Sequence, residues 1–91
     1  MEMAQIRYFI AVCEEKSFSG AARRCSVAQP SLSKAIKQLE RKLGGELFQR
    51  NGRSGVALTD LGRKVEPHLR IIWLSASAID DRWNKDQRSS I

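Results

Sequence analysis

The sequence predicts a mainly α-helical chain that carries one small β-hairpin. Apolar residues recur at helical spacing over most of the 91 residues, and an Asn-Gly pair separates two short apolar pieces near position 50. A chain of this length forms one small domain with a modest core, so a partner subunit could add to its stability. A hydrophobic content of 42% is ordinary for a folded protein.

Two short helices are expected at the N-terminus. In residues 3–16 the apolar side chains share one helical face, namely Ile6, Phe9, Ile10 and Cys13. Ser17 is then a suitable N-cap for a second helix, because its hydroxyl can accept a hydrogen bond from a free N–H of the first turn. Cys25-Ser26-Val27 would form the turn that follows, with Val27 in the core beneath it.

A third helix is expected over residues 28–43, with two contrasting faces. One face is apolar and carries Leu32, Ile36, Leu39 and Leu43. The opposite face carries Pro30, Lys34, Lys37 and Arg41. Pro30 lies in the first turn, where its missing N–H costs nothing. Gly44-Gly45 ends the helix, because glycine accepts the positive φ of a C-cap.

Residues 46–58 predict the hairpin. Leu47-Phe48 and Val56/Leu58 are short apolar pieces that flank Arg50-Asn51-Gly52-Arg53-Ser54-Gly55. Asn-Gly between two such pieces is a strong signal for a tight turn between strands. A short helix, a turn, a longer helix and then a hairpin describe a winged helix-turn-helix, in which residues 49–55 would be the wing.

A last helix is expected from Thr59, its N-cap, with Asp60 in the first turn opposing the helix dipole. Its apolar stripe lasts for about six turns and consists of Leu61, Val65, Leu69, Ile72, Ala76, Ile79 and Trp83. The stripe exceeds what a core of 58 residues can cover, which favours a dimer seam formed by Val65, Leu69, Ile72, Ala76, Ile79 and Trp83. Packing on the chain's own core is the alternative. Pro67 is expected to bend the helix locally.

These elements divide the chain into three parts. Residues 1–58 are expected to form a winged helix-turn-helix with a three-helix core and a small β-hairpin wing. Residues 59–84 would be a long linker and dimerisation helix, and residues 85–91 a polar, frayed tail.

Positive charge is concentrated in the middle of the chain. Residues 23–53 hold eight Lys or Arg and two Asp or Glu, which equals the net charge of +6 for the whole chain. A concentrated basic segment indicates a polyanionic partner, although a solvated basic surface is an equal alternative on charge alone. Within a helix-turn-helix, the helix 28–43 would fit the major groove of double-stranded DNA.

The residues expected to touch DNA fall into three groups. Base contacts would come from the first turns of the helix 28–43, at Gln29, Pro30, Ser33 and Lys34. Backbone contacts would come from Ser17, Ser19, Arg23, Ser31, Lys37 and Arg41, and wing contacts from Arg50 and Arg53. Taken singly, the serines could be ordinary exposed positions, and Lys37 and Arg41 could be surface charge balanced by Glu40 and Glu46.

Other functional classes find little support in the sequence. The two cysteines and the single histidine, His68, do not form a metal-ligand set, and no catalytic constellation or cofactor motif can be assembled. Cys13 and Cys25 lie on apolar helix faces, which favours inert packing over a redox role. No apolar run approaches the ~20 residues that span a bilayer, and the N-terminus lacks the pattern of a secretory signal. We therefore expect no enzyme, no cofactor and no membrane.

The chain resembles the N-terminal DNA-binding domain of LysR-type bacterial transcriptional regulators. The matching residues span nearly the whole chain: Phe9, Ser17-Phe18, Ala21-Ala22, Val27, Gln29-Pro30, Ser31, Ser33, Ile36, Leu39-Glu40, Leu43-Gly44, Leu47-Phe48, Arg50, Arg53, Val56, Leu58-Thr59 and Gly62. Three departures stand out. Lys34 replaces a frequent Arg, Ala28 replaces a frequent Ser, and the wing at 53–56 looks one residue longer.

The resemblance implies a regulator that dimerises, usually assembles further into tetramers, and binds interrupted inverted repeats in promoters. It implies a bacterial, cytoplasmic and nucleoid-associated protein. Full-length members also carry a C-terminal effector domain that senses a small molecule. We therefore expect these 91 residues to represent an isolated or truncated DNA-binding domain. The alternatives are a helical module whose basic face meets an acidic partner protein, and a protein that coats DNA without sequence preference.

Overall fold

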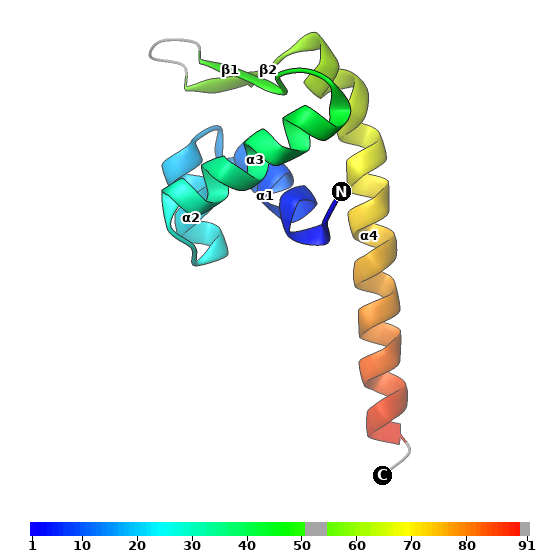
Figure 1. Cartoon of the computed structure of the whole chain (residues 1–91). Helices are drawn as coiled ribbons and strands as arrows, with labels where there is room; N and C mark the ends of the chain where they lie inside the picture. Colours follow the sequence, from blue (N-terminus) through cyan, green and yellow to red (C-terminus); the bar gives the residue numbers. More distant parts are fainter. Residues whose placement is uncertain (51–54, 90–91) are drawn as a thin grey trace.

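The computed structural model describes residues 1–50 and 55–89, with residues 81–89 described as helical backbone alone. Within these residues the elements follow the order that the sequence predicts (Figure 1). Their bounds are α1 Met3–Glu15, α2 Phe18–Cys25, α3 Gln29–Leu43, β1 Phe48–Arg50, β2 Val56–Leu58 and α4 Asp60–Ser89. The mainly helical fold with one small antiparallel sheet is confirmed.

The core lies between α1, α2 and α3 and extends to the first turns of α4. Its largest fully buried side chains are Phe9, Ile6, Leu32, Leu39, Leu47 and Val12. The expected apolar face of α3 is confirmed, because Leu32, Ile36 and Leu39 are all buried. Val27, in the turn before α3, packs against this core as expected. Because one face of α3 is buried in the core, the opposite face of the helix points to solvent.

The caps explain where α2 and α3 begin and end. The hydroxyl of Ser17 accepts a hydrogen bond from the backbone N–H of Gly20 at 3.0 Å, as predicted. Ser26 ends α2 in the left-handed region at φ 58°, and Gly44 ends α3 at φ 90°. Ala28 is the N-cap of α3 and offers no side-chain hydrogen bond, which agrees with the replacement of Ser by Ala in the sequence.

The predicted hairpin is present and is anchored to the helices. Strands β1 and β2 pair antiparallel, with Phe48 opposite Leu58. The Phe48 ring packs against the rings of Phe9 and Phe18, at centroid distances of 5.2 and 5.8 Å. The N–H of Val56 donates to the carbonyl of Lys16, so β2 is tied to the end of α1. The expected Asn-Gly turn, Arg53 and the extra wing residue lie outside the described residues.

Helix α4 begins against the hairpin through a close backbone contact. Thr59 caps α4 as predicted, since its hydroxyl accepts from the N–H of Gly62 at 3.1 Å and donates to the carbonyl of Glu46 at 2.6 Å. A Cβ at Gly62 would lie 2.3 Å from the carbonyl oxygen of Leu47. Only glycine allows this approach, so the residue fixes the start of α4 on the core.

Two residues of the expected dimer seam, Val65 and Leu69, lie in or against the chain's own core. Leu69 is 2% exposed and belongs to the chain's own core, and Val65 packs against that core. The first turns of α4 lie along α1, which covers this part of the stripe. Of the remaining seam residues, Ile72 and Ile79 are exposed and Ala76 is half-buried, while Trp83 lies where only the backbone is described.

Helix α4 is also longer than the sequence predicted. It runs unbroken through Pro67 and continues to Ser89, five residues past the expected end at 84. Residues 84–89 contain no Gly or Pro, and Lys, Gln and Arg are good helix formers. The second half of α4 projects away from the other helices (Figure 1) and gives the molecule a length of 53 Å.

Neither a membrane-spanning helix nor a metal-binding cluster is present in the described residues. Across residues 1–50 and 55–89, no helix is long and apolar enough to cross a bilayer. In the same part of the chain, no group of three His, Cys, Asp or Glu could hold a metal ion. Cys25 is buried and Cys13 half-buried, both as free thiols, and His68 is exposed on α4.

Candidate nucleic-acid interface

The outward face of α3 carries most of the residues expected to contact DNA. Gln29, Pro30, Ser31, Lys34, Lys37 and Arg41 are all exposed. They face solvent because the buried residues on the other side hold α3 against α1 and α2. Pro30 lies in the first turn, so the start of the helix is preorganised. The helix thus presents a polar and basic ridge on a rigid support.

Ser33 and the wing meet across a shallow cleft of about 400 Å³. The cleft lies between α3 and β1 and is lined by Phe18, Ser33, Ile36, Lys37, Glu40, Glu46, Phe48, Gln49 and Arg50. The guanidinium carbon of Arg50 lies 5.9 Å from the centroid of the Phe18 ring, a cation–π distance that orients the side chain. The structure therefore brings Ser33, Lys37 and Arg50 to one surface.

The cations of this surface are not neutralised by neighbouring carboxylates. The ion pairs among the described residues involve Arg24, Arg63 and Arg70. Lys37 and Arg41 form none of these pairs, although Glu40 and Glu46 lie nearby, and Oε2 of Glu40 accepts from the N–H of Leu47 instead. Their positive charge is thus available to a polyanion, which disfavours the interpretation of a balanced surface.

The candidate residues of α2 lie beside the start of α3. Ser19 and Arg23 are exposed, and Ser17 is half-buried. The Ser17 hydroxyl is already used as the N-cap and also lies 3.0 Å from the hydroxyl of Ser19. Arg23 belongs to the same exposed surface, whereas Arg24, its neighbour in sequence, turns towards acidic residues of α1.

Two contacts that the sequence analysis missed fix α3 in place. Oε2 of Glu40 accepts a hydrogen bond from the backbone N–H of Leu47 at 2.7 Å, which ties α3 to the start of β1. Nε2 of Gln5 donates to Oε1 of Gln38 at 3.3 Å and so links α1 to α3. Gln5 is buried, and a glutamine within an otherwise apolar face was the only sequence signal for this contact.

A second apolar face of α4 was also missed. Ile71 and Leu74 are 61% and 66% exposed, and they lie on the side of the helix opposite to Leu69. The sequence analysis followed one continuous stripe and placed Ile71 and Leu74 outside it. The signal that could have found them is the pair of isoleucines at 71 and 72, which belong to two different faces of one helix.

Cys13 lies at the contact between α1 and α4. Burial, followed by the negative charge of Glu66, raises the pKa of its thiol from 9.0 to about 12. A thiol held in its neutral form is a poor nucleophile. This environment agrees with the expectation that Cys13 has a packing role.

Comparison with known proteins places residues 3–63 in the family described as "Bacterial regulatory helix-turn-helix protein, lysR family". The chain is 42% identical over 81 residues to the transcriptional regulator BudR of Klebsiella aerogenes, covering 88% of this chain and 56% of BudR. It is 49% identical over 63 residues to a probable cat1 operon transcriptional activator of Acinetobacter lwoffii, covering 69% of this chain and 20% of that protein.

Two solved structures resemble the chain over nearly its whole length. The DNA-binding domain of CbnR in complex with DNA matches with a TM-score of 0.82 and 34% identity, covering 96% of this chain and 99% of that domain. The DNA-binding domain of BenM in complex with catB site 1 DNA matches with a TM-score of 0.79 and 36% identity, covering 99% and 97%. The winged helix-turn-helix architecture is therefore confirmed.

The chain spans between a fifth and about half of the length of these curated relatives, which are transcriptional regulators. The family match covers residues 3–63, which contain α1 to β2 and the start of α4. The chain belongs to the lysR family of bacterial regulatory helix-turn-helix proteins.

Proposed function

We propose that the chain binds double-stranded DNA sequence-specifically, as the DNA-binding domain of a LysR-type transcriptional regulator. The observation that carries this proposal is the exposed, unpaired basic face of α3, held rigidly on a buried core beside the wing. The DNA complexes formed by the similar domains of CbnR and BenM support it. Helix α3 would enter the major groove, with the wing at the minor groove or the backbone.

The candidate residues take different roles in this complex. Gln29 would pair with adenine, Lys34 would donate to guanine, and Pro30 would touch a thymine methyl, with Ser33 beside them. Phosphate contacts would come from Ser17, Ser19, Arg23, Ser31, Lys37 and Arg41. Arg50 and Arg53 would act from the wing. Such binding needs no cofactor, and catalysis has no part in the proposal.

We further propose that two copies associate through the exposed apolar face of α4. Ile71, Ile72, Leu74 and Ile79 are exposed apolar side chains that a monomer would leave in water, and an equivalent helix could cover them. Two recognition helices would then meet the two half-sites of an inverted repeat. In a longer protein with an effector domain, further assembly to a tetramer and control by a small molecule would follow. The site of action would be the cytoplasmic nucleoid of a bacterium.

Selection of bound duplexes from a random pool tests the proposal most directly. We expect an interrupted inverted repeat to be enriched, because a symmetric dimer reads the same sequence twice. The alternative function, a basic module for an acidic partner protein, predicts no binding to duplex even at low salt. Enrichment without any preferred sequence would indicate DNA coating and would contradict sequence-specific binding.

A further inference from the structure

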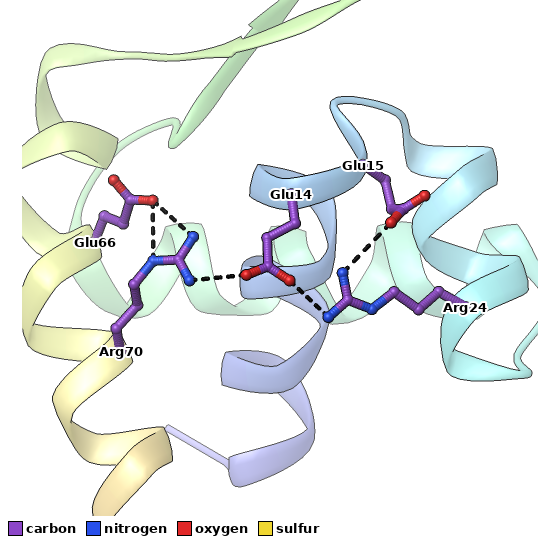
Figure 2. Close-up of polar contacts among 5 residues, drawn as sticks. All are labelled: Glu14, Glu15, Arg24, Glu66 and Arg70. Carbon is purple, nitrogen blue, oxygen red and sulfur yellow. Dashed lines mark hydrogen bonds and ion pairs between the residues drawn. The ribbon is translucent and has the colours of Figure 1, made fainter.

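Four charged side chains join three helices where α4 leaves the core (Figure 2). Oε1 of Glu14 lies 2.6 Å from Nη2 of Arg24 on α2, and Oε2 of Glu14 lies 3.1 Å from Nη1 of Arg70 on α4. Arg70 also donates through Nε and Nη2 to Glu66, at 3.2 and 3.1 Å. We call Glu14, Arg24, Glu66 and Arg70 the brace.

Glu14 is the centre of the brace, because each of its carboxylate oxygens forms an ion pair with an arginine of a different helix. Hydrogen bonds from Arg70 and then from Arg24 keep the pKa of the Glu14 carboxyl below its ordinary value. The same contact with Glu14 raises the pKa of Arg70. Glu14, Arg24 and Arg70 are therefore all charged at neutral pH, so the ion pairs that Glu14 forms in the brace are present at that pH.

The brace lies near the point where α4 leaves the core. Leu69 is buried and Trp73 packs against the core, whereas Leu74 is largely exposed. Apolar contacts hold α4 on the core but are not directional, so they permit small rotations. A guanidinium bound between two carboxylates is directional, because its donors form a rigid planar fork. The brace can therefore fix the angle of α4 more narrowly than packing does.

A small change in this angle has a large effect at the far end of the helix. At 1.5 Å per residue, the stretch from Arg70 to Ser89 is roughly 28 Å long. A rotation of about 10° at Arg70 would move the end of α4 by roughly 5 Å. That displacement exceeds the rise of about 3.4 Å between successive base pairs.

We propose that the brace sets the angle at which α4 leaves the core, and thereby the half-site spacing that a dimer accepts. Its members are positioning residues and do not touch DNA. The second part of the proposal rests on the proposed function. The side chains of Arg24 and Arg70 are 47% and 36% exposed, and single exposed ion pairs contribute little to stability. Orientation, more than stability, is therefore what the brace provides.

Residual dipolar couplings of the backbone N–H groups test the first part without DNA. Glu14→Gln removes the charge and keeps the side-chain length, and Arg70→Gln removes the guanidinium with a shorter side chain. Glu15→Gln is the matched control because the ion pair that Glu15 forms is with Arg24 on α2 and not with α4. We expect both brace variants to change the orientation of α4 relative to α1–α3, and Glu15→Gln to leave it as in the natural chain. Unchanged couplings in both brace variants would overturn the proposal.

Binding to the selected repeat, with its spacer lengthened or shortened by one or two base pairs, tests the second part. We expect the preference for the selected spacing to fall at least about fivefold in Arg70→Gln and Glu14→Gln, with the double variant no worse than either alone, as in a coupled network. Affinity for a single half-site should stay unchanged. A spacing preference equal to that of Glu15→Gln would refute this part, whereas failure of the natural chain to bind any duplex would refute the proposed function instead.

Discussion

Neighbouring side chains on α3, and likewise on α2, differ in their exposure and in their contacts. Ser33 faces the cleft beside the wing, whereas Lys34 is exposed to solvent. Arg23 is exposed, while Arg24 forms ion pairs with Glu14 and Glu15. Helical periodicity predicted which positions of α3 face outward. It could not predict the partner of Arg24, because that depends on where α1 lies.

Lys34→Ala tests direct base readout. We expect a loss of about 1–3 kcal/mol in binding to the selected site and relaxed selection at one base pair, since a donor to a base edge is removed. Titrations on the selected and on a scrambled duplex measure both effects. Equal losses on the two duplexes would remove Lys34 from the base-reading set.

Lys37→Ala is the matched comparison, one helical turn further along α3. We expect it to weaken binding to all duplexes alike and to make the slope of affinity against salt concentration shallower by about one unit, as for the loss of one phosphate contact. Titrations across a salt series measure this slope. An unchanged slope would mean that Lys37 does not meet phosphate.

The thiol of Cys13 provides a prediction on pH. Because the pKa of about 12 in the folded chain exceeds the ordinary 9.0, its contribution to stability is full below pH 9.0 and is lost as the pH rises from there. We expect stability to fall less steeply between pH 9 and 11 in Cys13→Ala than in the natural chain. Alkylation by iodoacetamide at pH 9, followed by mass spectrometry, should be at least about tenfold slower in the folded chain than in the unfolded chain. Equal rates would show that the thiolate forms freely.

Secondary-structure elements were largely predictable because their signals are local. Ser17 and Thr59 cap their helices as expected, and β1 and β2 form on either side of the Asn-Gly pair. The connections between elements were not predictable in the same way. Glu40 binds the N–H of Leu47, seven residues along the chain, and Gln5 reaches Gln38 from a different helix.

Gly62→Ala tests the close contact between the start of α4 and the backbone of Leu47, next to the hairpin. A Cβ at this position would collide with the Leu47 carbonyl, which is backbone and cannot move away cheaply. We expect a loss of about 1–3 kcal/mol in the free energy of unfolding, measured in urea. Gly45→Ala is the control, because its Cβ would meet only the flexible end of Leu61 at 3.0 Å. Equal losses in the two variants would contradict this account.

The molecule as a whole consists of a compact core and a helix that projects from it (Figure 1). The first turns of α4 complete the core through Leu69, and beyond them Ile71, Leu74 and Ile79 are exposed. The dimer expected from the sequence remains a proposal, but its surface differs from the predicted one. Ile72 and Ile79 are predicted seam residues that stay exposed, whereas Ile71 and Leu74 lie on a second face that the prediction did not include.

Leu74→Glu tests this surface. We expect the dimer to dissociate at concentrations where the natural chain is paired, because a buried, unpaired charge at an interface is costly. Sedimentation equilibrium measures the association. Lys64→Glu, at an exposed position earlier in α4, is the control and should leave association unchanged. Dimers of equal strength in both variants would place the interface elsewhere.

By itself, the sequence determined the four helices, the hairpin, the outward face of α3 and the family. Each of these depends on spacing, caps and residue types that lie close together in the chain. Only the tertiary structure decided which part of the α4 stripe is core and which is free, because the core covers the stripe as far as Leu69 and leaves Ile72 and Ile79 exposed. The brace was likewise decided only there, because Glu14 and Arg70 are 56 positions apart and meet only through packing.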